Sequence, residues 1–193
     1  SPMCHIVLWC ASISVQTQGP RVEARLYVAN HASILDGFVL TAVLGAPAFV
    51  AREEGLSKLP LYSTIVSAMQ LVFVRKGDPD SRRSAASAIE ERLTSTLRWP
   101  SLVIFPEGIT NAGSVQFHPF RTGAFRAGVA CHPILLEYPG TYFPPNDTGL
   151  LDELKLILSL MMRLHTRCKV TFLEPYEPSA AERADAKVYA ANV

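Results

Sequence analysis

The chain has 193 residues, of which 49% are hydrophobic and 18% are charged, and its formal net charge is +1 at pH 7. This length suits one domain with a substantial hydrophobic core and is short for two domains. The near-neutral charge argues against a nucleic-acid-binding protein, whose domain is usually strongly basic, and the apolar composition contains no run of 18 apolar residues that would form a complete membrane span.

The four cysteines indicate neither a disulfide framework nor a zinc site. Cys4, Cys10, Cys131 and Cys168 form no CxxC pair and lie in apolar surroundings. Such positions favour buried free thiols and a reducing, cytosol-facing compartment.

The first 20 residues are interpreted as an N-terminal stub that precedes a core over residues 21–193. Met3 to Ala11 is apolar but too short to span a bilayer, and no basic region precedes it as in a signal peptide. We expect this stub to be part of a longer segment.

Apolar runs predict strands and helices that alternate along the rest of the chain. The expected strands are Arg25–Ala29, Ala48–Ala51, Leu71–Val74, Leu102–Phe105, Pro133–Glu137 and Lys169–Leu173. The expected helices are Ser33–Leu44, Pro60–Met69, Asp80 or Ser81 to about Leu97, Leu150–Leu164 and Ala180–Ala191, with a short element over Gly123–Gly128. This alternation indicates a single α/β domain in which helices pack on a mainly parallel sheet.

The segment Asn30–Asp36 places an imidazole five positions before a carboxylate. Ser33 followed by Asp36 has the form of a capping box, which places His31 in the turn ahead of a helix. On a continuous helix the two side chains would point about 140° apart, so they face each other only if His31 folds back. A histidine oriented by a buried aspartate can act as a general base towards a hydroxyl. The alternative is a capped helix with an incidental histidine.

Three side chains that can bind or transfer protons or charged groups follow three different predicted strands. His31, Arg75 and Glu107 each lie just past the end of an apolar run. Because ligands of open α/β sheets bind beyond the carboxyl ends of the strands, we expect these side chains to contribute to one site.

These residues belong to four ordered blocks that resemble the glycerolipid acyltransferases, the 1-acylglycerol-3-phosphate acyltransferase superfamily. The blocks are Asn30-His31-x4-Asp36, Val72-Phe73-Val74-Arg75, Phe105-Pro106-Glu107-Gly108, and Pro133 in an apolar strand. The stretch from Val72 to Gly140 is similar to the lysophosphatidylcholine acyltransferase branch, through Asp78-Pro79-Asp80-Ser81-Arg82-Arg83, Trp99-Pro100, Gly123-Ala124-Phe125 and Tyr138-Pro139.

The resemblance implies the glycerolipid acyltransferase fold over an acyltransferase domain, and transfer of a fatty acyl group from acyl-CoA to the free hydroxyl of a lysophospholipid. The acceptor would be of the lysophosphatidylcholine type or lysophosphatidic acid, in phospholipid synthesis or remodelling. His31 would be the base, and Asp36 would fix its tautomer and stabilise the imidazolium. The substrate supplies the hydroxyl, so no enzyme nucleophile, metal or bound cofactor is needed, and the chain has no GxSxG elbow.

Five residues are candidates for substrate binding. Arg75 would hold the acceptor phosphate through two parallel hydrogen bonds from its guanidinium group. The alternative is that Arg75 is a solvent-exposed residue at the end of a strand with no role in binding. By resemblance, Glu107 and Gly108 would help to position the acceptor, with a structural Glu107 as the alternative, and Arg121 is a second phosphate candidate. The family usually has Thr directly after Glu-Gly, whereas this chain has Ile109 and then Thr110, which leaves acceptor choice open.

Two other functions remain alternatives. A lipid or acyl-chain hydrolase would hold a water where the acceptor hydroxyl lies, and a non-catalytic lipid-binding domain would use the same fold without turnover. Because both substrates are amphiphilic, the resemblance implies a membrane-associated enzyme at the cytosolic face of the endoplasmic reticulum or a related membrane. The stub at Met3–Trp9, following a membrane anchor, and the apolar helix at Leu150–Leu164 are the candidate membrane contacts, the latter being more typical of a buried core helix.

Overall fold

The computed structural model describes residues 5, 8, 12–33, 35–52, 70–75, 77–110, 118–140 and 165–193. The helices predicted over Pro60–Met69 and Leu150–Leu164 lie outside these residues, as do Cys4 and Cys10. Cys131 and Cys168 are free thiols and both are buried, as predicted.

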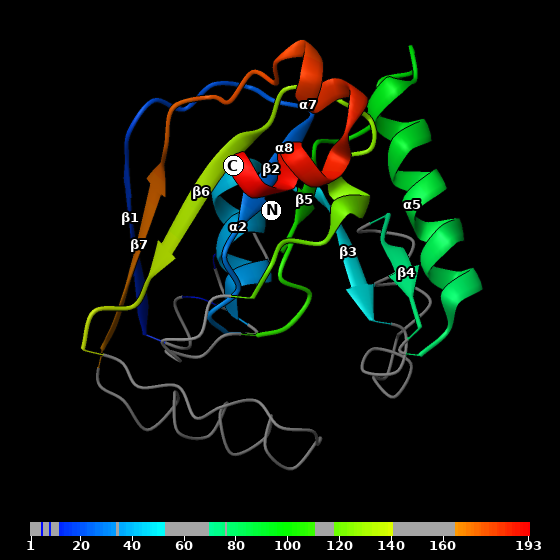
Figure 1. Ribbon diagram of the computed structural model, residues 1–193. Helices are drawn as coiled ribbons and strands as arrows, with labels where there is room; N and C mark the ends of the chain where they lie inside the picture. The colour runs from blue at the N-terminus through cyan, green and yellow to red at the C-terminus, as the bar shows by residue number, and fades with distance from the viewer. Residues whose placement is uncertain are drawn as a thin grey trace.

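Seven strands form one sheet, shown in Figure 1. Their order across the sheet is β1 (Ile13–Gln18), β7 (Thr166–Phe172), β6 (His132–Glu137), β2 (Leu26–Ala29), β5 (Leu102–Ile104), β3 (Ala48–Arg52) and β4 (Val72–Val74). Every neighbouring pair is parallel except β6 and β7, which are antiparallel. The prediction of a mainly parallel sheet is therefore confirmed.

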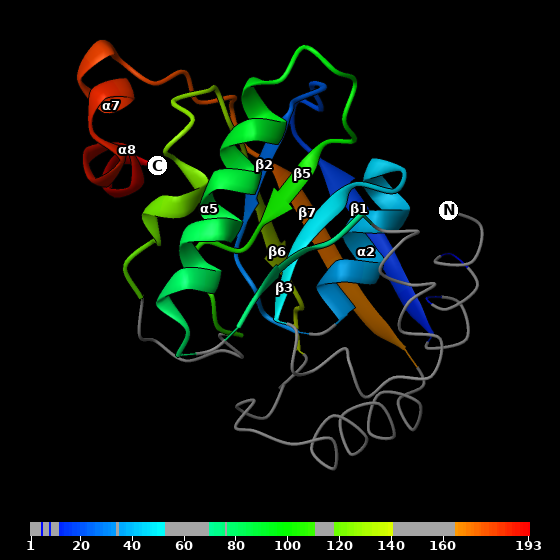
Figure 2. The same ribbon diagram turned by 90° about the vertical axis from the view of Figure 1, so that its right-hand side faces the viewer.

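Helices cover both faces of this sheet, as Figure 2 shows. Helix α2 (Leu35–Leu44) packs on one face, and α5 (Pro79–Thr94) packs on the other together with the 3-10 turn η1 (Thr122–Ala124) and α8 (Ala186–Asn192). Strand β2 is buried on both faces, because Tyr27 and Ala29 join the core under α2 while Leu26 and Val28 join the core under α5. This double burial explains why the strand reads as a continuous apolar run. Within the described part of the chain, no helix has both the length and the apolar composition needed to cross a bilayer.

Strand β1 lies within residues 1–20, which the sequence indicates as a stub with no predicted strand. Ile13 is buried but the second half of the strand is exposed and polar, so it lacks the apolar run that marks the other strands. It is recruited by parallel pairing with β7 along its whole length. Leu8 also belongs to the core under α2 and is 4% exposed. Apart from His5 and Leu8, the segment Met3–Trp9 lies outside the described residues, so its contact with a membrane stays a prediction.

Two predicted helix boundaries are also wrong. Helix α5 begins at Pro79, because the Asp78 carboxylate accepts hydrogen bonds from the amides of Asp80 and Ser81 and proline tolerates the first helical position. The helix expected over Ala180–Ala191 is two helices, α7 (Ala180–Ala184) and α8, because Asp185 leaves helical geometry and caps α8.

Candidate active site

The carboxyl ends of four parallel strands bring the predicted residues to one edge of the sheet. His31 follows β2, Glu107 follows β5, Arg75 follows the outer strand β4, and Tyr138 follows β6. Since β6, β2, β5, β3 and β4 all run in the same direction, these residues share an edge. The three residues expected at strand ends therefore lie at one edge of the sheet, and that they contribute to one site stays a prediction.

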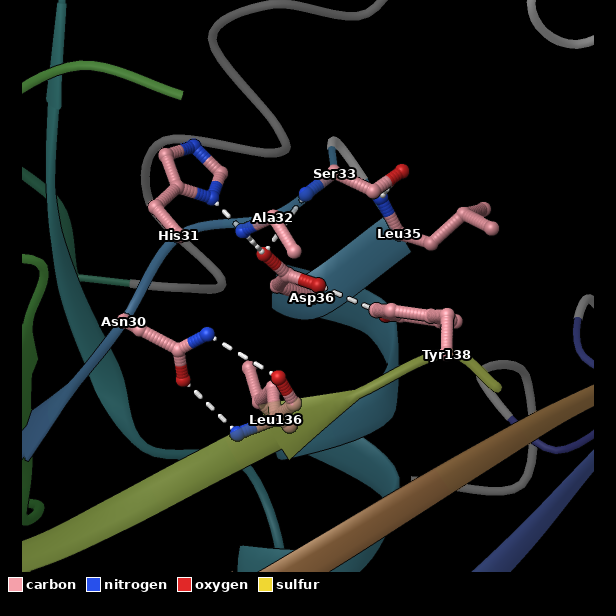
Figure 3. A network of polar contacts seen from close by, with 8 residues as sticks. All are labelled: Asn30, His31, Ala32, Ser33, Leu35, Asp36, Leu136 and Tyr138. Atoms are coloured by element: carbon pink, nitrogen blue, oxygen red, sulfur yellow. Dashed lines mark hydrogen bonds and ion pairs between the residues drawn. The ribbon is translucent and has the colours of Figure 1, made fainter. Parts of the chain in front are cut away.

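His31 folds back from the turn and contacts Asp36 on the first turn of α2, as Figure 3 shows. The distance from Nδ1 to Oδ2 is 2.9 Å, with the imidazole 23% exposed and the carboxylate fully buried. The helix start lies close to the predicted one. The Ser33 hydroxyl accepts from the amide of Leu35, and the Asp36 carboxylate accepts from the amide of Ser33.

The buried Asp36 carboxylate accepts four hydrogen bonds. Its Oδ2 accepts from the amides of Ala32 (2.6 Å) and Ser33 (2.8 Å) and from His31, and its Oδ1 accepts from the hydroxyl of Tyr138 at 2.6 Å. A buried carboxylate supplied with this many donors is stable in its ionised form. Because an ionised carboxylate can only accept, Nδ1 of His31 carries the hydrogen and Nε2 keeps its lone pair for a substrate proton.

The face of the imidazole is held by the loop that follows β5. The ring of Phe105 stacks on His31 with centroids 4.2 Å apart and an angle of 16° between the planes. Phe105 itself stacks on Phe49 of β3. His31 is therefore fixed at Nδ1 by Asp36 and on its face by Phe105, while Nε2 points away from Asp36 (Figure 3).

The loop after β5 also positions Arg121. Gly108 has a φ of +66° and its amide bonds the carbonyl of Phe105, which makes a tight turn around buried Glu107. The amide of Arg121 donates to the carbonyl of Pro106 at 2.8 Å, and a Cβ at position 108 would lie 2.4 Å from Nε of Arg121. The guanidinium stem of Arg121 thus lies directly against the backbone of Gly108.

The remaining two candidates lie further out. Arg75 is exposed at the end of β4, which β3 and β5 separate from β2, and its amide donates to the hydroxyl of Ser81. Thr110 is half-buried at the end of the described loop. The structure therefore brings His31, Asp36, Glu107, Gly108 and Arg121 together more closely than it does Arg75.

Sequence reasoning missed Phe105, Tyr138 and Asn30 as parts of the site. Asn30 is hydrogen-bonded to strand β6 through both polar atoms of its side chain. Its carboxamide donates to the carbonyl of Leu136 (2.9 Å) and accepts from the amide of Leu136 (2.7 Å). Their positions in the sequence could have indicated them. Tyr138 directly follows strand β6 and Phe105 directly follows strand β5, and His31 lies two residues after strand β2.

Comparisons with known proteins agree with the fold and the motifs. Residues 12–141 match the family model described as Acyltransferase. In structure, the chain is similar to the 1-acyl-sn-glycerophosphate (LPA) acyltransferase PlsC from Thermotoga maritima, with a TM-score of 0.64 and 20% identity over 99% of this chain and 73% of that one. This likeness shows a shared fold.

In sequence, the chain is similar to lysophosphatidylcholine acyltransferases. It is 37% identical to that of Drosophila melanogaster over 171 residues, which are 87% of this chain and 31% of the fly protein. It is 32% identical to lysophosphatidylcholine acyltransferase 1 of Homo sapiens over 178 residues, which are 90% of this chain and 32% of the human protein. The chain therefore spans about a third of the length of these relatives.

Proposed function

Because this chain belongs to the acyltransferase family, we propose that it transfers a fatty acyl group from acyl-CoA to the free hydroxyl of a lysophospholipid. The acceptor is of the lysophosphatidylcholine type, in line with the names of the relatives, or lysophosphatidic acid, in line with the name of the structural neighbour. The observation that carries this proposal is the His31–Asp36 pair, with Nδ1 and Oδ2 2.9 Å apart at the carboxyl edge of the sheet.

The proposed reaction is a direct attack that His31 assists as general base. Nε2 takes the proton of the acceptor hydroxyl while the oxygen of that hydroxyl forms a bond to the carbonyl carbon of the acyl-CoA thioester. Asp36 stabilises the imidazolium that results and keeps the ring in the required tautomer. When the tetrahedral intermediate collapses, the carbon–sulfur bond breaks, and the imidazolium returns its proton to the departing CoA sulfur.

The proposed acceptor site lies along the β5 loop. Arg121 and Arg75 hold the acceptor phosphate, since a guanidinium pairs with phosphate in a planar fork. Glu107, Gly108 and Thr110 shape the loop that positions the glycerol hydroxyl. The contact between Gly108 and Arg121 supports this arrangement.

We propose acyl-CoA as the co-substrate, with no metal or bound cofactor, because a general base and an activated thioester suffice for the chemistry. The acceptor is an amphiphile that resides in membranes. We therefore propose that the enzyme works at a membrane surface, on the cytosolic face of the endoplasmic reticulum or a related membrane.

The test is acyl transfer by the His31→Ala variant, measured with labelled acyl-CoA and pooled lysophospholipids. Turnover should fall by about 10² to 10⁴, the usual contribution of a general base, while the melting temperature changes little because a partly exposed turn residue is truncated. His165→Ala is the matched control, since His165 is exposed and its Nε2 lies 3.1 Å from the hydroxyl of Ser14.

Two outcomes would overturn the proposal. Near-normal turnover in His31→Ala would show that this histidine is not the base. Release of free fatty acid by the wild-type chain, with no labelled phospholipid, would identify a hydrolase that holds water in place of the acceptor.

A further inference from the structure

Resting on the proposed function, we propose that Tyr138 is a positioning residue of the acyl-transfer site, which orients the Asp36 carboxylate for His31. The family motif that contains His31 and Asp36 does not include this tyrosine. It reaches the site from the end of β6, 102 positions away from Asp36 in the chain.

Tyr138 bonds a different oxygen of Asp36 from the one that His31 bonds. Oδ2 accepts from His31 and from the amides of Ala32 and Ser33, whereas Oδ1 accepts from the hydroxyl of Tyr138 at 2.6 Å. The three bonds to Oδ2 restrain rotation about the Cβ–Cγ bond from one oxygen. The bond from Tyr138 to Oδ1 restrains the same rotation from the other oxygen, so that Oδ2 stays directed at Nδ1 of His31 (Figure 3).

The surroundings of Tyr138 set the direction of this hydrogen bond. Burial, and next the charge on Asp36, raise the pKa of the Tyr138 hydroxyl above its ordinary value. The thiol of Cys168 on β7 also bonds this hydroxyl, and burial raises the pKa of Cys168 to about 12. Tyrosine and thiol therefore both keep their protons at working pH, and the hydroxyl donates to a carboxylate that can only accept.

The scaffold keeps Tyr138 in register with the turn that carries His31. Asn30, directly before His31, is bonded through both atoms of its carboxamide to the backbone of Leu136, two residues before Tyr138. These two hydrogen bonds connect the end of β2 to the end of β6. The two strands are also paired in parallel. The distance between the hydroxyl and Asp36 is thus set by backbone contacts on both sides.

Removing the hydroxyl should alter how Asp36 supports the imidazole. Without the donor at Oδ1, the carboxylate has only the bonds at Oδ2 to hold it against His31, so the pH dependence of kcat should differ from that of the wild type. Among the described residues, the titratable groups that act on Asp36 from β6 and β7 are Tyr138 and Cys168, and Glu107 is on the loop that follows β5. Tyr138 and Cys168 stay neutral through the titration.

The experiment compares Tyr138→Phe with wild type in acyl transfer and in an NMR titration of the His31 ring. We expect kcat to fall about 10-fold, as for other hydrogen-bond partners one step removed from the reacting group, with the KM values for acyl-CoA and lysophospholipid unchanged. The midpoint of the His31 titration in Tyr138→Phe should differ from that in the wild type. Tyr189→Phe is the control, because Tyr189 is fully buried and its hydroxyl donates to the carbonyl of Val129 in the other core cluster.

A double variant tests whether Tyr138 acts through Asp36. Adding Tyr138→Phe to Asp36→Asn should cost no further activity, whereas additive losses would overturn the inference. An unchanged kcat and titration in Tyr138→Phe, with His31→Ala inactive, would also overturn it and leave the proposed function standing. If the wild type shows no acyl transfer, the proposed function fails. In that case the NMR titration still tests the inference, because an identical His31 titration in wild type and Tyr138→Phe would show that Tyr138 does not act on His31.

Discussion

At the scale of single residues, the site depends on a buried charge that is fully supplied with donors. Asp36 is completely buried, and an isolated carboxylate at such a position would protonate instead of remaining charged. Four hydrogen bonds from two parts of the chain, residues 31–33 and Tyr138, satisfy its oxygens. The charge needed to orient His31 is thus available without exposure to water.

Gly108 gives a residue-scale prediction about the acceptor site. Alanine at this position would place a Cβ 2.4 Å from Nε of Arg121, so the arginine must move. If Arg121 holds the acceptor phosphate, Gly108→Ala should raise the KM for lysophospholipid about 10-fold, since a hydrogen bond to a charged group contributes about 1.5 to 3 kcal/mol. Steady-state kinetics with varied acceptor and saturating acyl-CoA measure this effect.

Gly77→Ala is the matched control for this prediction. Gly77 has a φ of +79°, and no atom of the described residues lies within 4 Å of a Cβ built there, so backbone strain is the expected cost of alanine at this position. Both variants should lose similar stability, about 1 kcal/mol for an alanine in the left-handed region. An unchanged acceptor KM in Gly108→Ala would place Arg121 outside the acceptor site.

At the scale of elements, helices α7 and α8 are joined by one carboxylate. Glu182 completes a capping box with Ser179, and its Oε1 also accepts from the hydroxyl of Tyr176 (2.6 Å) and from the side-chain Nδ2 of Asn192 (2.7 Å). The bond from Tyr176, followed by those from Asn192 and Ser179, lowers the pKa of Glu182 from 4.5 to about 2. The ionised carboxylate therefore stabilises this pair of helices.

The lowered pKa predicts how Glu182→Gln depends on pH. A group whose pKa is lower in the folded state stabilises the fold above its unfolded pKa and loses this effect as the pH falls through the folded value. The difference in melting temperature between wild type and Glu182→Gln should therefore be full at pH 7 and shrink between pH 4.5 and about 2. Thermal melts across this range measure it.

Glu177→Gln provides the comparison for the same segment. Glu177 is 73% exposed and pairs with Arg183 at 3.4 Å, so its replacement should have little effect at any pH. A Glu182→Gln difference that stays constant down to pH 2 would show that the charge of Glu182 is not what holds the two helices.

At the scale of the whole molecule, the core extends into the N-terminal segment. Strand β1 forms one edge of the sheet, and Leu8 packs in the core under α2. The family match, which begins at residue 12, includes β1. The folded unit therefore starts earlier than residue 21.

Leu8→Ala tests this extension of the core. Because Leu8 is 4% exposed, its truncation should lower the free energy of unfolding by about 2 to 5 kcal/mol, the usual cost for a buried leucine. Leu97→Ala is the control, since Leu97 is 65% exposed and should change stability by less than about 0.5 kcal/mol. Urea unfolding measures both variants, and equal small losses would show that Leu8 lies outside the core.

The sequence by itself determined the fold class and the central pair of the site. Buried strands such as Leu102–Ile104 are marked by short apolar runs, and residues that follow such runs fall at one edge when the strands are parallel. The pairing of His31 with Asp36 is local, since five positions and a helix start bring the two side chains together. Both kinds of information lie within a few residues of chain.

Only the tertiary structure decided the strand order, the strand β1 and the partners that complete the site. Strand β1 lacks an apolar run and exists through its pairing with β7, more than 150 positions away. Tyr138 meets Asp36, and Arg121 meets Gly108, because separate strands end side by side. Such contacts leave no periodic signal in the sequence, since they depend on how distant segments pack and not on the spacing of residues within one segment.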